Sequence, residues 1–435
     1  MSKIVQLISN NCGNITPDSV DEYVKAGGFE GLKKAFTMKP AAIIAEVKAA
    51  KLLGRGGAAY PAGSKWQHLL EIPEFPKYIV CNADEGEPGT FKDKLLLSQE
   101  PLRVIEGMII AGYVFNSNDG YIYIRGEYEA IQRTFQKALD HAIEEGYLGE
   151  KILGTDFSFN IHIKTGAGAY VCGENSALLN SIEGKAGRPR IKPPHLAEVG
   201  LFLKPTLVNN VESFATIPII TQIGGEKYLS YGTKDSGGTK LVCLSGHAAK
   251  RGVYEVPFGI TLRDIIYDPE IGGGIAGGKK LKFFHLGGQS GPCGIPAQLD
   301  TPYCYKALRT AGLAVGSGAV VVMDESVCVV DYLKGVTEFF IHESCGKCTP
   351  CRQGNQQLYK ILCRMTSGAG AQDDIEKIQR LIDIMTKTSF CGLGQAAAVA
   401  VSTCLLYFKD EFEAHLNGIC PAGYCVFESE IEALR

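Results

Sequence analysis

The sequence predicts a multidomain α/β protein, and three observations lead to this prediction. Strand and helix patterns alternate over residues 53–236, strand patterns dominate residues 237–325, and helical patterns fill residues 1–52 and 326–416. Alternating strands and helices are typical of a layered domain with a mainly parallel sheet. A chain of 435 residues is also too long for a single hydrophobic core. Residues 417–435 are expected to form a C-terminal hinge or tail.

The first two parts are expected to contain short, regularly spaced elements. In the N-terminal helical segment, Pro17 and Pro40 stand where helices begin. In the layered domain, runs of β-branched and aromatic residues predict strands at 77–81, 120–125 and 160–164, and apolar periodicity predicts helices at 105–113 and 127–145.

The third part has the pattern of a small α+β module similar to a ubiquitin-like β-grasp. Its expected strands are 239–245, 252–256 and 280–286, and its one helix is 261–266. The fourth part predicts a helical bundle with helices at 331–343, 351–366, 372–386, 395–408 and 410–416.

One segment of the expected bundle could also be a membrane-spanning helix. Residues 390–408 carry no charged side chain and are long enough to approach a membrane span. Gly392, Gly394, Gln395 and Ser402 dilute this segment, so a buried bundle helix is the preferred interpretation.

The composition excludes some classes of function. A net charge of −3 gives no basic surface for nucleic acid. The first residues lack the apolar core of a signal peptide, and the 15 cysteines include close-spaced groups. We therefore expect a cytoplasmic protein whose cysteines bind metal rather than form disulfides.

The most specific motif is a cysteine run in the fourth part. Cys345, Cys348 and Cys351 are separated by two residues each, and Cys391 follows much later within Ser-Phe-Cys-Gly-Leu-Gly. Three close thiols with one distant thiol are typical of [4Fe–4S] ligands. A structural zinc site, the alternative, usually has two pairs of close ligands. The spacing therefore predicts a one-electron carrier.

Two glycine-rich segments and one acidic segment indicate a phosphate-bearing cofactor. Residues 54–63 expose several glycines before Lys65, and residues 166–175 follow an expected strand. Glycine backbones present N–H groups to phosphate, although either segment alone also suits an ordinary turn. Residues 81–90 place Asn82, Asp84, Glu85 and Glu87 after a strand, where α/β proteins collect site residues, although a solvated acidic turn is the alternative.

Together these motifs resemble a known family. The chain is similar, from about residue 35 to about 416, to the flavin-containing, NADH-oxidising subunit of respiratory complex I and to its relatives in soluble NAD-linked hydrogenases, formate dehydrogenases and electron-bifurcating complexes. The resemblance lies in residues 54–66, 81–97, 166–175 with 204–212, and 343–354 with Cys391.

The resemblance implies the cofactors and the residues that bind them. It implies FMN and NAD(H) in the layered domain, an SLBB-like β-grasp module and a [4Fe–4S] cluster in the bundle. It implies FMN contacts at Gly54, Gly56, Lys65, Asn82, Asp84, Tyr170, Gly173, Glu174, Asn209 and Asn210, with Glu85 as a further cofactor-binding residue. It implies NADH contacts at Gly57, Tyr60, Lys65, Glu87 and Lys192, with Glu87 as the catalytic-site residue that positions the nicotinamide.

Three positions depart from the family pattern. Asn175 replaces a frequent second glutamate, and His68 and His195 replace aromatic residues that stack on adenine. Loss of a carboxylate reduces repulsion toward a phosphate, so the choice between NAD(H) and NADP(H) stays open.

The C-terminal tail resembles the zinc-carrying hinge of bifurcating relatives. We expect a Cys₃His zinc site formed by Cys363, His415, Cys420 and Cys425, with reduced tail thiols as the alternative. Cys243 and Cys328 are expected to be buried core residues.

The expected function is that of a diaphorase subunit. Hydride from NADH reduces FMN, and single electrons then pass to the cluster and to partner subunits of a soluble complex, or the reverse. The expected partners are a small thioredoxin-like [2Fe–2S] subunit and a larger catalytic subunit. The alternatives are a bifurcating complex with ferredoxin as a further partner and a non-catalytic iron–sulfur scaffold.

Overall fold

The structure is a computed structural model that describes residues 3–427. It divides into two compact units. The first contains the residues up to Cys243, with Val253–Ile260 and Pro302–Ala307, and the second contains Leu244–Gly252, Thr261–Thr301 and the residues from Leu308 onward. The cofactor-binding motifs lie in the first unit and the cysteine motifs in the second.

The first unit is built on a parallel four-stranded sheet of the order β3-β2-β1-β4. The strands are β1 (Tyr78–Ala83), β2 (Asp119–Ile124), β3 (Asn160–Thr165) and β4 (Thr206–Asn210). The first three match the expected strands closely, and the parallel pairing confirms the expected α/β class. Strand β4 was not among the expected strands.

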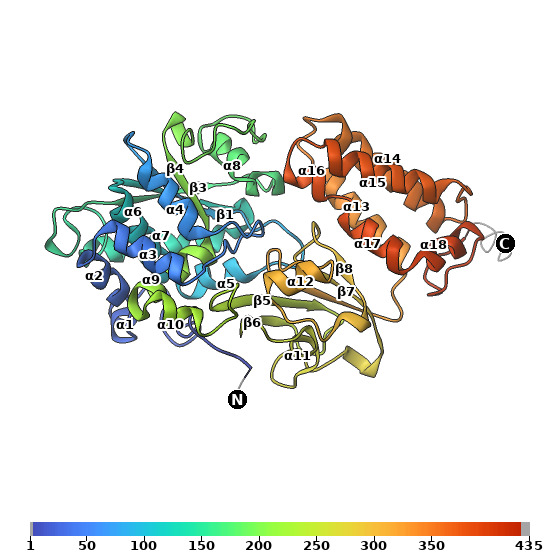
Figure 1. Cartoon of the computed structure of the whole chain (residues 1–435), viewed down its shortest axis with the longest axis horizontal. Coiled ribbons are helices and arrows are strands. Elements are labelled where there is room, and N and C mark those ends of the chain that lie inside the picture. The colour runs from blue at the N-terminus through green and yellow to red at the C-terminus, as the bar shows by residue number, and fades with distance from the viewer. Residues whose placement is uncertain (1–2, 428–435) are drawn as a thin grey trace. The chain divides into compact units, whose positions relative to one another are not determined.

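The described residues of the first unit form the helices α1 to α10 (Figure 1). They are α1 (Val20–Lys25), α2 (Glu30–Phe36), α3 (Pro40–Ala49), α4 (Ala62–Glu71), α5 (Lys92–Gln99), α6 (Pro101–Phe115), α7 (Glu129–Glu144), α8 (Asn175–Ile182), α9 (Val211–Ile223) and α10 (Gly225–Leu229). Helices α6 and α9 pack on each other and on β1. Their contact requires Gly107, because a Cβ there would lie 2.0 Å from Phe214 O.

The side chains of each strand alternate between the core and the opposite face of this sheet. Ile79, Cys81, Ile122 and Leu207 point into the core that includes α6 and α9. Val80, Asn82 and Val208 point to the opposite face of the sheet.

The β-rich module contains a five-stranded sheet of the order β6-β5-β9-β7-β8. Its elements are β5 (Thr239–Gly246), β6 (Gly252–Pro257), α11 (Leu262–Tyr267), β7 (Leu281–Leu286), β8 (Cys293–Gly294), α12 (Tyr305–Thr310) and β9 (Ala319–Asp324). Strand β7 pairs antiparallel with both β8 and β9. A capping box formed by Thr261 and Asp264 fixes the start of α11.

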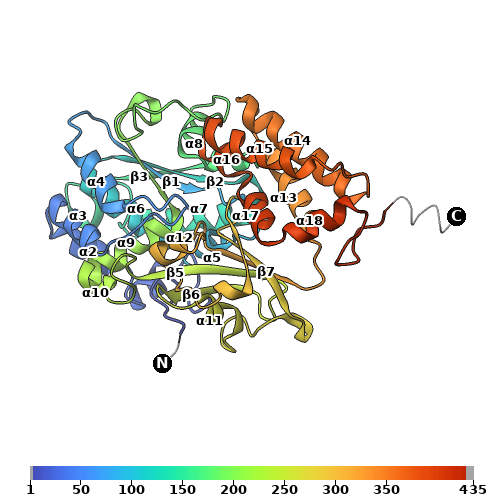
Figure 2. The same cartoon turned by 45° about the vertical axis from the view of Figure 1, so that its right-hand side comes forward.

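The C-terminal bundle contains α13 (Val329–Glu343), α14 (Thr349–Thr366), α15 (Asp374–Thr388), α16 (Gly392–Ala396), α17 (Val399–Tyr407) and α18 (Lys409–Leu416). Helix α14 packs against both α13 and α15, and the two ribbon views show these helices side by side (Figures 1 and 2).

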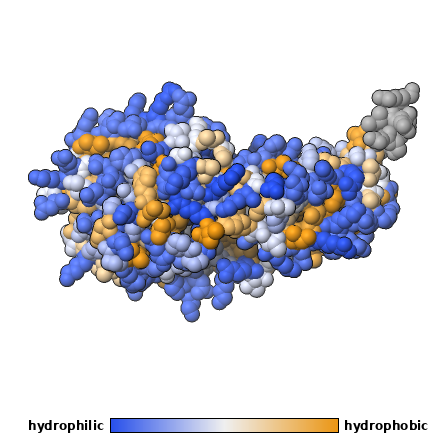
Figure 3. Space-filling model, turned by 90° about the horizontal axis from the view of Figure 1, so that it is seen from above, coloured by the Kyte–Doolittle hydropathy of each residue, from blue (hydrophilic) through white to orange (hydrophobic). Residues whose placement is uncertain are grey.

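The uncharged segment 390–408 is not one continuous helix. It divides into α16 and α17, so the single helix expected at 395–408 is wrong. Within residues 3–427, no helix is both long and apolar enough to cross a membrane. Hydrophilic side chains cover much of the face shown in Figure 3, with smaller apolar groups between them.

Candidate functional site

The parallel sheet reverses its winding between β1 and β4. The chain proceeds from β1 through β2 to β3 and then returns to the other side of β1 as β4. Open α/β sheets bind ligands at such a reversal, beyond the carboxyl ends of the strands. Asn82 and Asn210 are register partners at this end of β1 and β4. The polar residues expected from the sequence therefore meet at the position where the topology favours a site.

The segment after β3 reaches the same edge of the sheet. Asn82 Nδ2 donates to Gly173 O at 2.8 Å and to Asn175 Oδ1 at 3.1 Å. A Cβ on Gly173 would lie 3.5 Å from Asp84 O, so the two backbones pass close together. The structure thus joins the acidic segment and the second glycine-rich segment.

The first glycine-rich segment forms a closed loop against β4. Gly54 N donates to Tyr60 O at 2.9 Å, which closes the loop. Gly57 has a φ of +120°, a conformation that favours glycine. A Cβ on Gly56 would lie 3.1 Å from Asn210 Cβ, so backbone rather than side chain faces the strand end. This is the arrangement that lets a loop present its N–H groups to phosphate.

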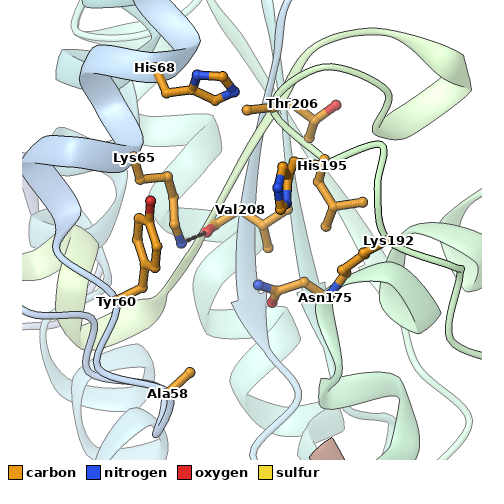
Figure 4. Close-up of a pocket in the computed structure, with 11 residues that line it drawn as sticks. Ala58, Tyr60, Lys65, His68, Asn175, Lys192, His195, Thr206 and Val208 are labelled. Atoms are coloured by element: carbon orange, nitrogen blue, oxygen red, sulfur yellow. Dashed lines mark hydrogen bonds between the residues drawn. The ribbon is translucent and has the colours of Figure 1, made fainter. Parts of the chain in front are cut away.

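A cavity of about 450 Å³ lies within the first unit (Figure 4). Three of its lining residues, Tyr60, Lys65 and Lys192, are ones expected to contact NADH. The other residues that line it include all three departures from the family pattern: Ala58, His68, Asn175, His195, Leu196, Ala197, Thr206 and Val208. Its size fits part of a nucleotide, and none of the described residues that line it carries a carboxylate.

Lys65 gives the cavity a cation whose charge depends on pH. Its Nζ donates to Val208 O at 3.0 Å (Figure 4). Burial, together with the positive charge of Lys192, lowers the pKa of Lys65 to about 8. An anionic ligand would favour the ammonium form of Lys65.

Glu174 and Lys192 form an ion pair next to the cavity. Lys192 Nζ lies 2.7 Å from Glu174 Oε1. The other carboxylate oxygen of Glu174 accepts from Ser176 N and Ala177 N and so caps α8. Burial raises the pKa of Glu174, but hydrogen bonds from Lys192 and Ser176 lower it by more. Glu174 therefore fixes the start of α8 and orients Lys192, and its expected contact with FMN stays a prediction.

Two histidines line one part of the cavity, and Glu198 contacts both. His195 N donates to Glu198 Oε2 at 2.9 Å, and His68 Nε2 lies 3.6 Å from Glu198 Oε1. Glu198 thus lies between His68 on α4 and the loop that carries His195. The sequence did not single out Glu198, and only its position three residues after His195 could have indicated it.

Glu87 and Tyr170 contact each other outside the cavity lining. Tyr170 Oη donates to Glu87 Oε1 at 3.2 Å. Within residues 3–427, neither residue lines the cavity of Figure 4. The hydrogen bond nevertheless joins the acidic segment to the loop after β3, as the resemblance implies for a shared site.

Glu85 has a structural partner at every carboxylate oxygen. Its Oε1 accepts from Asp93 N at 2.8 Å, and its Oε2 accepts from Lys94 N at 2.9 Å and Tyr128 Oη at 3.1 Å. Burial raises the pKa of Glu85 to about 7. Glu85 therefore caps the start of α5, and a direct cofactor contact is only a prediction.

The side chains of Asn209 and Asn210 also form hydrogen bonds with other residues of the chain. In the amide orientation that satisfies both its ends, Asn209 accepts from Trp66 Nε1 at 3.1 Å and donates to Val208 O at 3.1 Å. Asn210 accepts from Lys92 Nζ at 3.0 Å and donates to Asp93 Oδ2 at 2.6 Å. Lys92 also pairs with buried Glu212, 3.1 Å away. These contacts hold the side chains at the end of β4 in place. Two glycine-rich backbones and a partly buried lysine lie beside it, and these groups fit a phosphate-bearing cofactor.

The four cysteines expected to bind the cluster lie in the second unit. Cys351 lies in the first turn of α14, and Cys348 is the N-cap residue of that helix. Burial raises the pKa of Cys351, a hydrogen bond with Ser344 lowers it, and the charges of Cys348, Cys391 and Cys345 raise it. Phe390 N, in the residue before Cys391, donates to Cys348 Sγ at 3.5 Å, so the distant cysteine lies beside the close-spaced run. A Cβ on Gly394 would lie 2.9 Å from Cys351 Cβ. The glycines around Cys391 thus allow the close approach that the sequence predicts, and four convergent thiols fit a [4Fe–4S] cluster.

A second group of metal-ligating side chains lies at the end of the bundle. The ligand atoms of Cys328, His415, Cys420 and Cys425 all lie within 4.8 Å of one another. Cys328 Sγ is 3.3 Å from His415 Nε2 and 3.6 Å from Cys425 Sγ, and Cys425 Sγ is 3.5 Å from His415 Nε2. A tetrahedral zinc site with bonds of about 2.3 Å to sulfur and about 2.0 Å to nitrogen has edges of about 3.5–3.8 Å. The donor set and its spacing therefore fit zinc.

This group differs from the ligand set expected from the sequence. Cys328, which is buried as expected, also belongs to the group, and Cys363, expected to be a ligand, does not. Cys363 lies within α14, where it is next to Tyr359. Cys328 is the N-cap of α13, and its Sγ accepts from Asp331 N at 3.4 Å. This hydrogen bond lowers the pKa of Cys328, but burial raises it by more, to about 11. Cys243 is a buried core residue as expected.

Comparisons with known proteins find matches for both the layered domain and the C-terminal bundle. Residues 47–219 match the Nuo51 FMN-binding domain, and residues 331–415 match the NADH-ubiquinone oxidoreductase-F iron-sulfur binding region. The chain is 44% identical over 424 residues to the NADP-reducing hydrogenase subunit HndC of Solidesulfovibrio fructosivorans, covering 97% of this chain and 86% of that protein. It is also 44% identical over 404 residues to the F subunit of NADH-quinone oxidoreductase of Streptomyces coelicolor, covering 93% and 89% of the two chains.

A solved structure shows the same fold. A chain of the NAD⁺-reducing [NiFe]-hydrogenase in the H₂-reduced state superposes with a TM-score of 0.81 at 34% identity, covering 92% of this chain and 66% of that one. These matches confirm the expected fold, FMN and the [4Fe–4S] cluster. The chain belongs to the family of the NADH-quinone oxidoreductase F subunits and their counterparts in nicotinamide-reducing hydrogenases, with an FMN-binding domain and an iron–sulfur binding region.

Proposed function

We propose that this chain is the diaphorase subunit of a multisubunit redox complex, oxidising NADH or reducing NAD. The observation that carries this proposal is the cavity that Lys65 and Lys192 line, in the same unit as the sheet reversal where Asn82 and Asn210 meet. The same chain carries the expected cluster ligands Cys345, Cys348, Cys351 and Cys391, and an iron–sulfur binding region matches residues 331–415. When bound, FMN links the two-electron chemistry of a nicotinamide to the one-electron chemistry of an iron–sulfur cluster.

The residues of the first unit bind and orient rather than react. Lys65 and Lys192 supply positive charge toward the phosphates of a dinucleotide, and the loop from Gly54 to Tyr60 supplies backbone N–H groups. His68 and His195 present flat rings on which a base can stack. Glu87, held by Tyr170, positions the nicotinamide. No residue acts as a nucleophile in this scheme.

The test is NADH oxidation by the purified holoprotein, prepared without oxygen, with an artificial one-electron acceptor. The wild-type protein is expected to turn over, and denaturation is expected to release FMN. A holoprotein that contains neither FMN nor NADH-dependent activity would contradict the proposal and would favour the scaffold alternative.

A second candidate substrate is NADP(H). The cavity is lined by Lys65, Lys192, His68 and His195, and Asn175 stands where relatives often have a glutamate. The hydrogenase subunit HndC, which is named as NADP-reducing, is 44% identical to this chain. A comparison of kcat/KM for NADH and NADPH decides between the two nucleotides.

The second unit supports a further proposal, that Cys328, His415, Cys420 and Cys425 bind one zinc ion. His415 is oriented for this, because its Nδ1 contacts Glu411 O at 2.6 Å and leaves Nε2 toward the thiols. Cys420 and Cys425 lie in the tail that resembles the hinge of bifurcating enzymes, which supports the alternative that ferredoxin is a further partner. Ferredoxin-coupled turnover in the purified complex would establish that version, and NADH oxidation independent of ferredoxin would count against it.

We also propose partner subunits and a cellular location for this chain. A subunit that only fills its own cluster has no net reaction, so we propose a small thioredoxin-like [2Fe–2S] subunit and a larger catalytic subunit as its partners. None of the 15 cysteines, all of which lie among residues 3–427, forms a disulfide. The lack of disulfides among these residues suits a reducing compartment, which supports the proposal of a cytoplasmic location. Identification of the subunits that co-purify with the chain tests this.

A further inference from the structure

The sulfur of Cys351 has an environment unlike those of the other three cluster cysteines. Cys351 is 5% exposed, whereas Cys345, Cys348 and Cys391 are more exposed to solvent. Gly394 packs closely against Cys351, because a Cβ on this glycine would lie 2.9 Å from Cys351 Cβ. Hydrogen bonds to Cys351 therefore act in a surrounding of low dielectric constant, where they are electrostatically strong.

Ser344 is positioned to donate to this sulfur. Its Oγ lies 3.2 Å from Cys351 Sγ, and it accepts from Gly346 N at 3.3 Å. A sulfur that is bound to a cluster carries no proton, so in that state the hydroxyl of Ser344 is the donor to Cys351. Ser344 is also the C-cap residue of α13, where its own N–H donates to Phe340 O at 3.1 Å. The backbone thus holds the hydroxyl in place.

Asn355 approaches the same sulfur from one turn further along α14. It is fully buried, and its Nδ2 donates to Cys351 O at 2.9 Å and lies 3.6 Å from Cys351 Sγ. Its Oδ1 has no hydrogen-bond partner among residues 3–427. A buried, unsatisfied amide oxygen costs free energy that an apolar residue of the same size would avoid. Within the described part of the chain, the polar contacts that this amide makes are all with Cys351.

We propose that Ser344 and Asn355 are positioning residues that set the reduction potential of the cluster through hydrogen bonds to the Cys351 sulfur. This inference rests on the proposed function, since it requires Cys351 to be a cluster ligand. Reduction adds negative charge, and N–H and O–H dipoles directed at a ligand sulfur stabilise that charge. Removal of either donor shifts the potential to a more negative value.

The test compares Ser344→Ala, Asn355→Leu and the double variant with the wild-type holoprotein. Ser344→Thr keeps the hydroxyl, and Ser367→Ala serves as the matched control. Ser367 donates to Arg364 O at the far end of α14, away from the cluster cysteines at the start of that helix. Iron and sulfide content, the EPR spectrum of the reduced cluster and the midpoint potential from an EPR-monitored titration are measured for each protein.

We expect full iron content in every variant and a more negative potential in both single variants. The double variant should show the largest shift, and Ser344→Thr and Ser367→Ala should match the wild-type potential. Unchanged potentials in proteins that retain the cluster would overturn the inference and leave the proposed function intact. If Asn355→Leu loses the cluster, the comparison of Ser344→Ala with Ser344→Thr is the test. Equal midpoint potentials in these two variants overturn the inference. A wild-type holoprotein without iron would instead overturn the proposed function.

Discussion

Cys328 Sγ lies 3.3 Å from His415 Nε2, although 87 positions separate the two residues in the chain. Cys328 starts α13 and His415 lies in the last turn of α18, so the contact joins the two ends of the C-terminal bundle. The loop that carries Cys420 and Cys425 completes the group. One metal ion at this point would tie the tail of the chain to the bundle.

Zinc content tests this group of residues. The wild-type protein is expected to contain about one zinc ion per chain in addition to its iron. Cys328→Ser removes a ligand and should reduce zinc content to a small fraction, with a lower melting temperature for the bundle. Cys363→Ser, the matched control, should retain the zinc. Equal zinc content in the two variants would contradict the assignment of Cys328.

The pKa of Lys65 predicts how nucleotide affinity depends on pH. With a pKa of about 8, Lys65 is mostly charged at neutral pH and loses its charge as the pH rises. The ammonium form attracts phosphate, so the affinity for NADH should fall as the pH rises through about 8, by up to about tenfold per pH unit above the pKa. The dissociation constant is measured from about pH 6.5 to about pH 9.5, a range that brackets this pKa.

Lys65→Arg is the control for this pH dependence. Arginine stays charged over the whole range, so the variant should show a flat profile even if its affinity is lower. Superimposable profiles for the wild-type protein and Lys65→Arg would show that Lys65 is not the titrating group.

The choice between nucleotides is expected to depend on Asn175. Asn175→Glu introduces a carboxylate into the cavity and should repel the additional phosphate of NADPH more than it affects NADH. The ratio of kcat/KM for NADH over NADPH should rise about tenfold, which corresponds to about 1.4 kcal/mol. Asn175→Gln, which adds length without charge, should leave the ratio near that of the wild-type protein. An unchanged ratio in Asn175→Glu would place the additional phosphate elsewhere.

Glu87 is expected to act in binding more than in chemistry. Glu87→Gln should raise the KM for NADH about tenfold, the effect of losing about 1.4 kcal/mol from one charged hydrogen bond, with a smaller change in kcat. Tyr170→Phe removes the 3.2 Å hydrogen bond that holds Glu87 and should raise the KM by a smaller factor. A fall in kcat with an unchanged KM would assign Glu87 a role in the chemical step instead.

Features that depend on neighbouring residues were predictable from the sequence. The spacing of Cys345, Cys348 and Cys351 indicates a cluster because a single loop carries all three thiols. The strands from Tyr78 and Asp119 follow from runs of β-branched and aromatic residues. Their parallel order then places Asn82 and Asn210 at one edge, where the acidic segment was expected to contribute to a site.

Features that depend on tertiary contacts were not predictable in the same way. Cys328 looks like any apolar-flanked cysteine until the fold brings it to His415. Glu85 follows a strand like its neighbours, but its two oxygens cap α5, and this shows only when Asp93 and Lys94 are placed in space. The division of residues 395–408 into α16 and α17 also leaves no mark in the apolar pattern.

The central claim is that one polypeptide holds FMN and a [4Fe–4S] cluster and connects them to a nicotinamide nucleotide. An anaerobic NADH titration of the holoprotein, followed by the flavin absorbance and by EPR, tests it most directly. The wild-type protein should lose its flavin absorbance and gain the EPR signal of a reduced cluster, and Cys348→Ala should keep the first change and lose the second. A wild-type protein that shows neither change with NADH or NADPH would contradict the account.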